Sequence, residues 1–461
     1  MKSIFMLIIM SAMIYAANFD QLFQEGKILS DSGKYTEAVV KYEAAVKVKS
    51  KHPEANYNLG FSYFKTGNFE KALKYLKNAQ KFTYDAIKVH HALALVYQAM
   101  GDKQMAILEH SEAIKLAPKN PLVHTKLADL YLEQRSINLA EQEYNTALKY
   151  DSMFVPAIVG LANITKHNRQ YPEAMKLFDK AKKIDSTYAA TYISLGRLYS
   201  ELNTFNKAVV ELNKYVQLEP NDPDGYKFLA EIYTQFKNYI YAINNTKLAI
   251  QHGDTSPGSL RFLGYLYLRN RQPKDAREVL VQAVLRVPDD VNAWVDLGKA
   301  YLLVDSGQSA VNAFDKAFTL DSFSVNNFVF DYGNAYYSAS KYDSSAMMFT
   351  RKIKLDTLAV GAYLNRALAY IQLKKYDDAI KDLTKGLKIK PDHVQGHLWL
   401  GQIYAFLNKT QQARTEFNTV IKLDPKNTEA KKGLGQLSAP PPVIKPENIY
   451  SDEEEEDVFN P

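Results

Sequence analysis

Two histidines spaced four residues apart come closest to a metal-binding pattern in this chain. His393 and His397 would share one face of a helix, where two imidazoles can bind the same zinc ion. No third ligand accompanies them, and no His-Glu-x-x-His motif is present. His90 and His124 hold the position of His397 in earlier copies of a repeated segment. We therefore interpret these histidines as residues of a core or groove and expect no metal site.

The residues that other catalytic chemistries need are also missing. The chain has no cysteine, which excludes thiolate nucleophiles, disulfides and Cys-based metal sites. It has no glycine-rich loop of the P-loop or dinucleotide-binding type. Since almost the whole chain is repetitive, no separate domain remains to house an active site. We expect neither an enzyme nor a bound cofactor or small-molecule substrate.

A small residue that returns every 34 positions organises the chain. The first series contains only glycine and alanine, gains one extra residue after its ninth member, and runs Gly26, Gly60, Ala94, Ala128, Ala162, Gly196, Ala230, Gly264, Gly298, Gly333, Ala367 and Gly401. A second small residue follows each member after twelve positions, and a tyrosine follows ten of the twelve members after three positions. A fixed period of this length indicates stacked structural repeats.

Each repeat unit contains two stretches with the apolar spacing of a helix, separated by a break such as Thr66-Gly67-Asn68. The predicted unit starts are Phe19, Pro53, Ile87, Pro121, Val155, Ala189, Pro223, Pro257, Val291, Asn326, Val360 and Val394. Two helices joined by a short turn approach closely only where the side chains at their contact permit it. We therefore expect the two series of small residues to face each other, with the tyrosine covering the joint.

The eleventh unit shows the pattern clearly, with AYLNRALAY at residues 362–370, KYDDAI at residues 375–380 and a closing Pro391. It resembles the tetratricopeptide repeat family, whose unit is a helix–turn–helix of 34 residues. The resemblance covers residues 19–427. It implies an all-α fold, a right-handed α-solenoid of about twelve units, protein or peptide partners, and no catalytic residues. Some members of this family hold an acidic peptide C-terminus with a clamp that includes a lysine and an asparagine at the fifth and ninth unit positions. We do not expect this clamp, because no unit of this chain has a lysine followed by an asparagine at those positions.

The first residues predict export. Lys2 precedes an uncharged apolar run that ends in small residues at Ala16 and Ala17, the pattern of a secretory signal peptide over residues 1–17. The run is shorter than the ~20 apolar residues of a spanning helix, and a retained N-terminal anchor is the alternative. No cysteine follows the run, which excludes a bacterial lipoprotein. In a bacterium, the protein would be periplasmic or extracellular.

The last residues differ in composition from the repeats, which we expect to occupy residues 18–427. The pattern of residues 428–438 predicts a capping helix. Residues 439–461 begin with Ala439 and three prolines, and they contain six consecutive acids, Asp452–Asp457. From residue 439 onward there are one lysine and seven acids, net −6, so the rest of the +6 chain carries +12. We expect this tail to be disordered in solution.

The first helix of each unit predicts a partner-binding groove, because first helices line the concave wall of such solenoids. Side chains at about the second, fifth, ninth and twelfth unit positions should face it. The candidates are Tyr57, Phe61, Phe64, Arg197, Lys227, Arg261, Tyr265, Arg269, Phe330, Tyr337, Leu364, Leu368, Ile371 and Leu398. They predict two apolar ends and a partly basic middle. The alternative is that neighbouring helices bury them.

We therefore expect an exported scaffold or adaptor that holds peptides or proteins in this groove, with arginine and lysine selecting acidic groups. In a bacterium, a role in envelope assembly would follow from export. An alternative is a self-regulated module, in which the acidic tail competes with a ligand for the basic solenoid. Nucleic-acid binding is a remote alternative, because lysines and arginines are dispersed along the chain.

Overall fold

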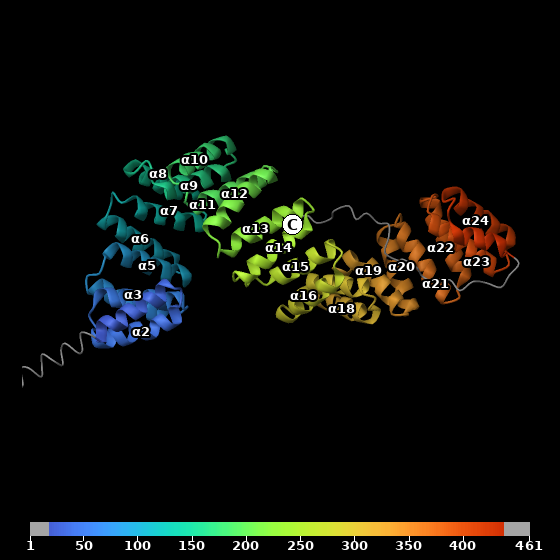
Figure 1. Cartoon of the computed structure of the whole chain (residues 1–461), viewed down its shortest axis with the longest axis horizontal. Helices are drawn as coiled ribbons and strands as arrows, with labels where there is room; N and C mark the ends of the chain where they lie inside the picture. The colour runs from blue at the N-terminus through green and yellow to red at the C-terminus, as the bar shows by residue number, and fades with distance from the viewer. Residues whose placement is uncertain (1–17, 438–461) are drawn as a thin grey trace, which may run out of the picture. The chain divides into compact units, whose positions relative to one another are not determined.

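The computed structural model describes residues 18–437 as a run of antiparallel helix pairs, with no strand among these residues (Figure 1). The predicted signal peptide, residues 1–17, and the predicted tail, residues 439–461, lie outside the described residues, as does Ser438. Inter-residue contacts divide the chain into unit 1, which ends at Pro220, and unit 2, which begins at Asn221. None of the described helices is long and apolar enough to cross a membrane.

Unit 1 contains the first half of the repeats. Residues 18–31 are helical. The helices that follow are α2 (Tyr35–Val48), α3 (Pro53–Lys65), α4 (Phe69–Lys81), α5 (Ala86–Ala99), α6 (Lys103–Leu116), α7 (Pro121–Glu133), α8 (Ile137–Tyr150), α9 (Val155–His167), α10 (Tyr171–Ile184), α11 (Ala189–Glu201) and α12 (Phe205–Leu218).

Unit 2 contains the second half and a short terminal helix. Its helices are α13 (Pro223–Gln235), α14 (Tyr239–Gln251), α15 (Gly258–Arg269), α16 (Pro273–Arg286), α17 (Val291–Leu303), α18 (Gly307–Leu320), α19 (Val325–Ser338), α20 (Tyr342–Leu355), α21 (Val360–Gln372), α22 (Tyr376–Ile389), α23 (Val394–Phe406), α24 (Thr410–Leu423) and α25 (Thr428–Gly435). Consecutive helices pack as pairs in both units, which confirms the predicted all-α solenoid class. Helix α25 contacts α23 and α24 and buries Ala430 against them.

The glycines of the first small series make room for large side chains as well as for the second small series. We predicted that small residues would face each other across each helix pair, and a Cβ on Gly60 would lie 3.1 Å from the carbonyl oxygen of Ala72. A Cβ on Gly298 would also lie 2.7 Å from a ring carbon of Phe314, and one on Gly196 would lie 2.7 Å from Leu212 Cγ. In each pair the large residue comes sixteen positions after the glycine. The missing side chain is therefore replaced by a bulky core residue of the second helix.

Ser345 is the one member of the second small series that is not alanine, and the structure explains it. Its side chain is fully buried, where an unpaired hydroxyl would be costly. The Ser345 hydroxyl donates a hydrogen bond of 2.9 Å to the carbonyl oxygen of Gly333. The serine thus fits the space of an alanine and links the two helices of its repeat.

The fourth residue of several units ties its helix to the preceding turn. Trp294 Nε1 donates to the carbonyl oxygen of Pro288 over 2.9 Å, and the Tyr192 hydroxyl donates to that of Ser186 over 2.8 Å. In both cases the acceptor lies six residues earlier in the chain. These bonds satisfy carbonyl groups of the turns between repeats and help to fix the register of successive repeats.

Candidate binding surface on the first helices

The first helices of unit 1 form a continuous wall. Helix α3 contacts α5, α5 contacts α7, α7 contacts α9, and α9 contacts α11. We call the surface made by these five helices the first-helix wall. Because every helix–turn–helix repeat has the same register, side chains at equivalent positions line up along this wall. Two groups of residues on the wall stand out, one aromatic and one polar.

The aromatic cluster, Tyr57, Phe61 and Phe64, lies on α3 and is half-buried. The ring centroids of Tyr57 and Phe61 are 6.1 Å apart, and those of Phe61 and Phe64 are 5.9 Å apart. The ammonium group of Lys65 lies 5.5 Å from the Phe61 ring centroid, within cation–π range. Burial raises the pKa of Tyr57 to about 12, so its hydroxyl stays neutral. The cluster presents partly exposed ring surface beside a cation.

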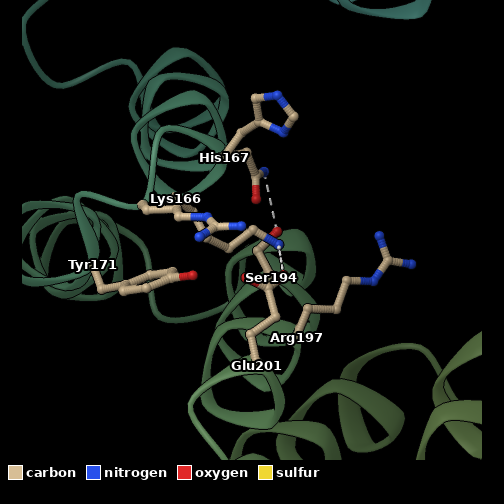
Figure 2. A pocket seen from close by; sticks show the side chains of 8 residues that line it. Lys166, His167, Tyr171, Ser194, Arg197 and Glu201 are labelled. Carbon is tan, nitrogen blue, oxygen red and sulfur yellow. Dashed lines mark hydrogen bonds and ion pairs between the residues drawn. The ribbon is translucent and has the colours of Figure 1, made fainter. Parts of the chain in front are cut away.

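The polar pocket lies at the other end of the wall, where α9, α10 and α11 meet (Figure 2). Its volume is about 550 Å³, within the range of about 300–1,000 Å³ typical of ligand sites. It is lined by Asn163, Lys166, His167, Arg169, Tyr171, Ser194, Arg197 and Glu201. All these residues belong to unit 1. The C-terminal ends of two neighbouring first helices supply six of them, and the turn after α9 and the start of α10 supply the other two.

The pocket has more positive than negative charge. Lys166 Nζ lies 3.0 Å from a carboxylate oxygen of Glu201, so this lysine is already paired. Arg169 and Arg197 are exposed, and neither forms an ion pair within residues 18–437. Figure 2 shows the Arg197 side chain extending away from Lys166 and Glu201. Two guanidinium groups therefore remain available to an anionic ligand.

Of the pocket residues, only Arg197 was a predicted site residue. Asn163 and Lys166 hold the ninth and twelfth positions of the fifth repeat. The rule that selected Arg197, by its position in the first helix of its repeat, would have found them too if applied there. Asn163 Nδ2 donates to Ser194 Oγ over 3.2 Å and links α9 to α11. Arg169 and Tyr171 lie in the turn and the second helix, which a rule based on first helices does not cover.

The predicted basic middle is neutralised in unit 2. Lys227 Nζ lies 3.8 Å from a carboxylate oxygen of Asp254, and Arg261 lies 3.8 Å from one of Asp296. Burial raises the pKa of Asp296 to about 6, against the opposing effects of Lys299 and Arg261. We call this series of pairs, which continues with Lys299 and Asp331 at 3.7 Å, the charge ladder. Arg261 and Lys299 are thus each paired with an acid in the next repeat, and Lys227 is paired with an acid in the turn that precedes the next repeat.

Two other predicted site residues of unit 2 also have partners within the chain. Arg269 Nε donates to the Tyr239 hydroxyl over 3.3 Å, and its guanidinium lies 5.7 Å from the Tyr239 ring centroid. Tyr265 is half-buried beside Phe262, with their ring centroids 6.3 Å apart. Among the described residues, these basic side chains of unit 2 thus differ from Arg197 of unit 1, which forms no ion pair within residues 18–437.

The apolar end predicted in unit 2 is wrong as a binding surface. Five of its six residues are buried in the core, namely Tyr337, Leu364, Leu368, Ile371 and Leu398. Leu364 shows the reason. A Cβ on Gly386 of α22 would lie 3.2 Å from Leu364 Cδ2, and one on Gly396 of α23 would lie 3.3 Å from the same atom. The two glycines allow both helices to close over the leucine.

Phe330, the sixth of these residues, is half-buried against Phe349, with ring centroids 5.6 Å apart. The interpretation in which neighbouring helices bury the candidates therefore holds for five residues and in part for the sixth.

The paired histidines have separate structural partners. His393 Nδ1 accepts a hydrogen bond of 3.0 Å from the backbone N–H of Gly396 and caps α23. His397 Nδ1 lies 2.6 Å from a carboxylate oxygen of Glu416, and its Nε2 lies 3.0 Å from the carbonyl oxygen of Pro391. Within residues 18–437, no group of three or more His, Cys, Asp or Glu side chains could hold a metal ion. These histidines act in capping and helix pairing.

Comparison with known families gives matches along much of the chain. Sequence models described as TPR repeat or tetratricopeptide repeat match residues 26–67, 53–85, 87–120, 125–189, 167–232, 263–324, 360–393 and 394–427. No curated protein matches the chain.

Solved structures with similar repeats include three of low sequence identity. One is titled as a functional characterisation of Pseudomonas aeruginosa pilF, with 21% identity, a TM-score of 0.39 and coverage of 45% of this chain and 95% of that one. Another is the C-terminal part of a TPR repeat-containing protein from Cytophaga hutchinsonii, with 18% identity, a TM-score of 0.43 and coverage of 52% and 98%. A third, titled as MamA, has 21% identity, a TM-score of 0.33 and coverage of 36% and 95%. Values this low say nothing of shared partners.

Proposed function

The chain belongs to the tetratricopeptide repeat family, and we propose that it is a protein-interaction scaffold whose first-helix wall in unit 1 holds a peptide segment of a partner protein. The family's repeats serve protein interaction and supply no catalytic residues. The proposal concerns which surface of this chain binds and what chemistry it selects.

One observation carries the proposal: the same wall has partly exposed aromatic rings near one end and unpaired guanidinium groups near the other. The rings of Tyr57 and Phe61 offer apolar surface, which gains free energy when a partner covers it. Arg169 and Arg197 offer planar donors that fit carboxylates. We infer that the preferred segment has apolar or aromatic side chains followed or preceded by acidic ones.

We further propose that this scaffold acts outside the cytoplasm. The support is the sequence of residues 1–17, which has the charge, apolar core and small residues of a secretory signal peptide. In a bacterium, the partners would then be periplasmic or envelope proteins, and a role in envelope assembly follows. Detection of the mature N-terminus near Ala16 or Ala17 by mass spectrometry supports export, whereas an intact Met1 in the cytoplasmic fraction contradicts it.

The binding surface is tested by placing a photo-crosslinking amino acid at Phe61 or Arg197 in the full chain, in its native cells. The matched controls are Val40 on α2 and Val210 on α12, which are 63% and 66% exposed and lie on second helices of the same unit. We expect one partner to crosslink at both wall positions and at neither control. Equal capture at the controls, or none at the wall, would overturn the assignment.

A further inference from the structure

Net charge is unevenly distributed along unit 2. Residues 221–359 contain 15 basic and 15 acidic side chains, net zero. Residues 360–437, which form the last two repeats and α25, contain 13 basic and 7 acidic side chains, net +6. Residues 439–461 contain one lysine and seven acids, net −6. The net positive charge of residues 221–437 thus lies entirely in the last two repeats and α25, and the residues after them balance it.

Six lysines at the C-terminal end of unit 2 make up what we call the basic edge. They lie at the ends of α22 and α24, in the turns that follow these helices, and on α25, and they are Lys388, Lys390, Lys422, Lys426, Lys431 and Lys432. All six are exposed, and none forms an ion pair with another residue of the range 18–437. Lys388 and Lys422 hold the same position in neighbouring repeats, so they lie on the same side of the solenoid.

The acids on the basic edge are fewer than its lysines, and two of them are hydrogen-bonded within the chain. Asp424 Oδ1 accepts the backbone N–H of Lys426 over 3.1 Å, and a carboxylate oxygen of Glu429 accepts from Gln402 Nε2 over 3.3 Å. The third acid, Asp392, is exposed. Six lysines and three acids give the edge a net charge of +3. Because like charges gathered on one surface raise its potential, an anion that covers them is attracted.

The basic edge matches a segment of its own unit. We propose that the six consecutive acids at Asp452–Asp457 cover the basic edge and close it to other anionic partners. The six carboxylates equal the six lysines in number. The proposed contact joins parts of unit 2 only, and it does not involve the first-helix wall of unit 1. This inference is therefore independent of the proposed function.

The connection between the acidic segment and the basic edge is long enough for this contact. The 14 residues from 438 to 451 separate the segment from Leu437, which closely follows α25. Fully extended, 14 residues reach about 46–50 Å. Helix α25 has 8 residues and is about 12 Å long, so the connection exceeds the length of the helix that carries Lys431 and Lys432. A tethered ligand has an effective concentration on the order of millimolar, so even a weakly binding segment can cover the edge.

The charge ladder is a poorer site for the same segment. Lys227, Arg261 and Lys299 are each within 4 Å of an aspartate oxygen. A carboxylate that bound one of them would have to displace an internal acid, and Asp296 is buried. Removing the partner of a buried charge is costly, because the buried group is left uncompensated. The lysines of the basic edge have no such internal competitor among residues 18–437.

Zero-length carbodiimide crosslinking tests the contact, because it joins carboxylates to amines that touch them. In the full-length chain, the acidic segment should link to lysines of the basic edge. Lys274 on α16 and Lys316 on α18 are the matched controls, since both are exposed lysines on second helices of earlier repeats in unit 2. They should give no links to the segment. Links that are missing from the basic edge, or equally frequent at the controls, would overturn the proposal.

A mixture of nitrogen-15-labelled and unlabelled chains shows whether the links form within one copy. Links within a copy join peptides of the same isotope, and this is the expected result. Links that join peptides of different isotopes report a second copy of the chain on the basic edge, and their predominance would overturn the proposal.

A fluorescein-labelled peptide of six glutamates tests whether the segment closes the edge, with binding measured by fluorescence anisotropy. The native chain is compared with a neutralised chain in which the four glutamates at positions 453–456 are replaced by glutamine. Neutralisation should tighten peptide binding about tenfold, the effect of removing a tethered competitor at millimolar effective concentration whose dissociation constant is on the order of 0.1 mM. The difference should shrink as salt is raised, because the charges are exposed. Equal dissociation constants in the two chains at low salt would overturn the proposal.

The location is tested in the neutralised chain with K388E and K422E together. Peptide binding should weaken at least about fivefold, since two attractive charges become repulsive. The control variant carries K274E and K316E, which make the same charge change in earlier repeats and should leave binding unchanged. Circular dichroism melts check that both variants fold. Binding that survives K388E and K422E, or that falls equally in the control, would overturn the assignment to the basic edge.

Discussion

Gly264 on α15 lies directly against Leu280 on α16: a Cβ added to the glycine would be 2.4 Å from Leu280 Cγ. Carbon atoms in contact are normally about 3.5–4.0 Å apart, so the pair leaves no space for a methyl group. Equivalent pairs recur along the chain, for example Gly298 with Phe314. This contact between the two helices of a repeat recurs along the solenoid, and its role in packing can be tested directly.

Gly264→Ala should destabilise the α15–α16 pair by about 1–3 kcal/mol, because Leu280 or the helix backbone must move. The measurement is the free energy of local opening of α15 and α16 by hydrogen exchange. Gly258→Ala on the same helix is the matched control, since no atom lies within 4 Å of a Cβ there. It should be neutral or slightly stabilising. Equal effects of the two substitutions would contradict the packing account.

Two substitutions in the turn between the helices of a repeat should change the stability of that repeat in opposite directions. Lys374 has φ of 59° and Gly67 has φ of 79°, both in the left-handed region, at the same position of their repeats. Lys374→Gly should stabilise its repeat by about 0.5–1 kcal/mol, because glycine tolerates this conformation. Gly67→Ala should destabilise by about 1 kcal/mol, although no atom lies near the new Cβ. Local hydrogen exchange measures both, and effects of the same sign would be inconsistent with a backbone origin.

His397 predicts that the last repeat loses stability as pH rises. Its hydrogen bond to Glu416 raises its pKa above 6.5. A histidine whose pKa is raised by folding stabilises the native state below about pH 6.5, and this contribution disappears as pH rises through the folded-state pKa. Opening of α23 and α24, corrected for intrinsic exchange rates, should therefore become easier on going from pH 6 to pH 9. His397→Gln should remove that dependence, and a flat profile in the native chain would refute it.

His110 predicts the opposite pH dependence in the third repeat. Burial lowers its pKa to about 4, with smaller contributions from His91, Lys126 and His90. A histidine with a lowered pKa contributes stability above about pH 6.5, which is lost as pH falls toward 4; the loss is about 2–3 kcal/mol. His110→Leu should abolish it, and leucine suits the site because Leu76 and Leu280 hold the equivalent position. Equal acid sensitivity of α5 and α6 in both chains would contradict this assignment.

The sequence predicted the fold well because the 34-residue period specifies both helices of every repeat. It predicted the site only in part. Arg197 was found because its position faces the wall, but Leu364 at a comparable position is covered through glycines of the two following helices. Burial depends on such neighbours, which a positional rule ignores. The pairing of Arg261 with Asp296, 35 residues later, was missed for the same reason, although a search for acids one repeat ahead would have suggested it.

The most direct test of the central claim is a hydrogen-exchange footprint of the full-length chain with and without the partner captured by crosslinking. The account predicts slower exchange in α3 and at the C-terminal ends of α9 and α11, with no change in the second helices α2 and α12. Protection confined to those second helices, or to unit 2, would contradict the claim that the first-helix wall of unit 1 holds the partner.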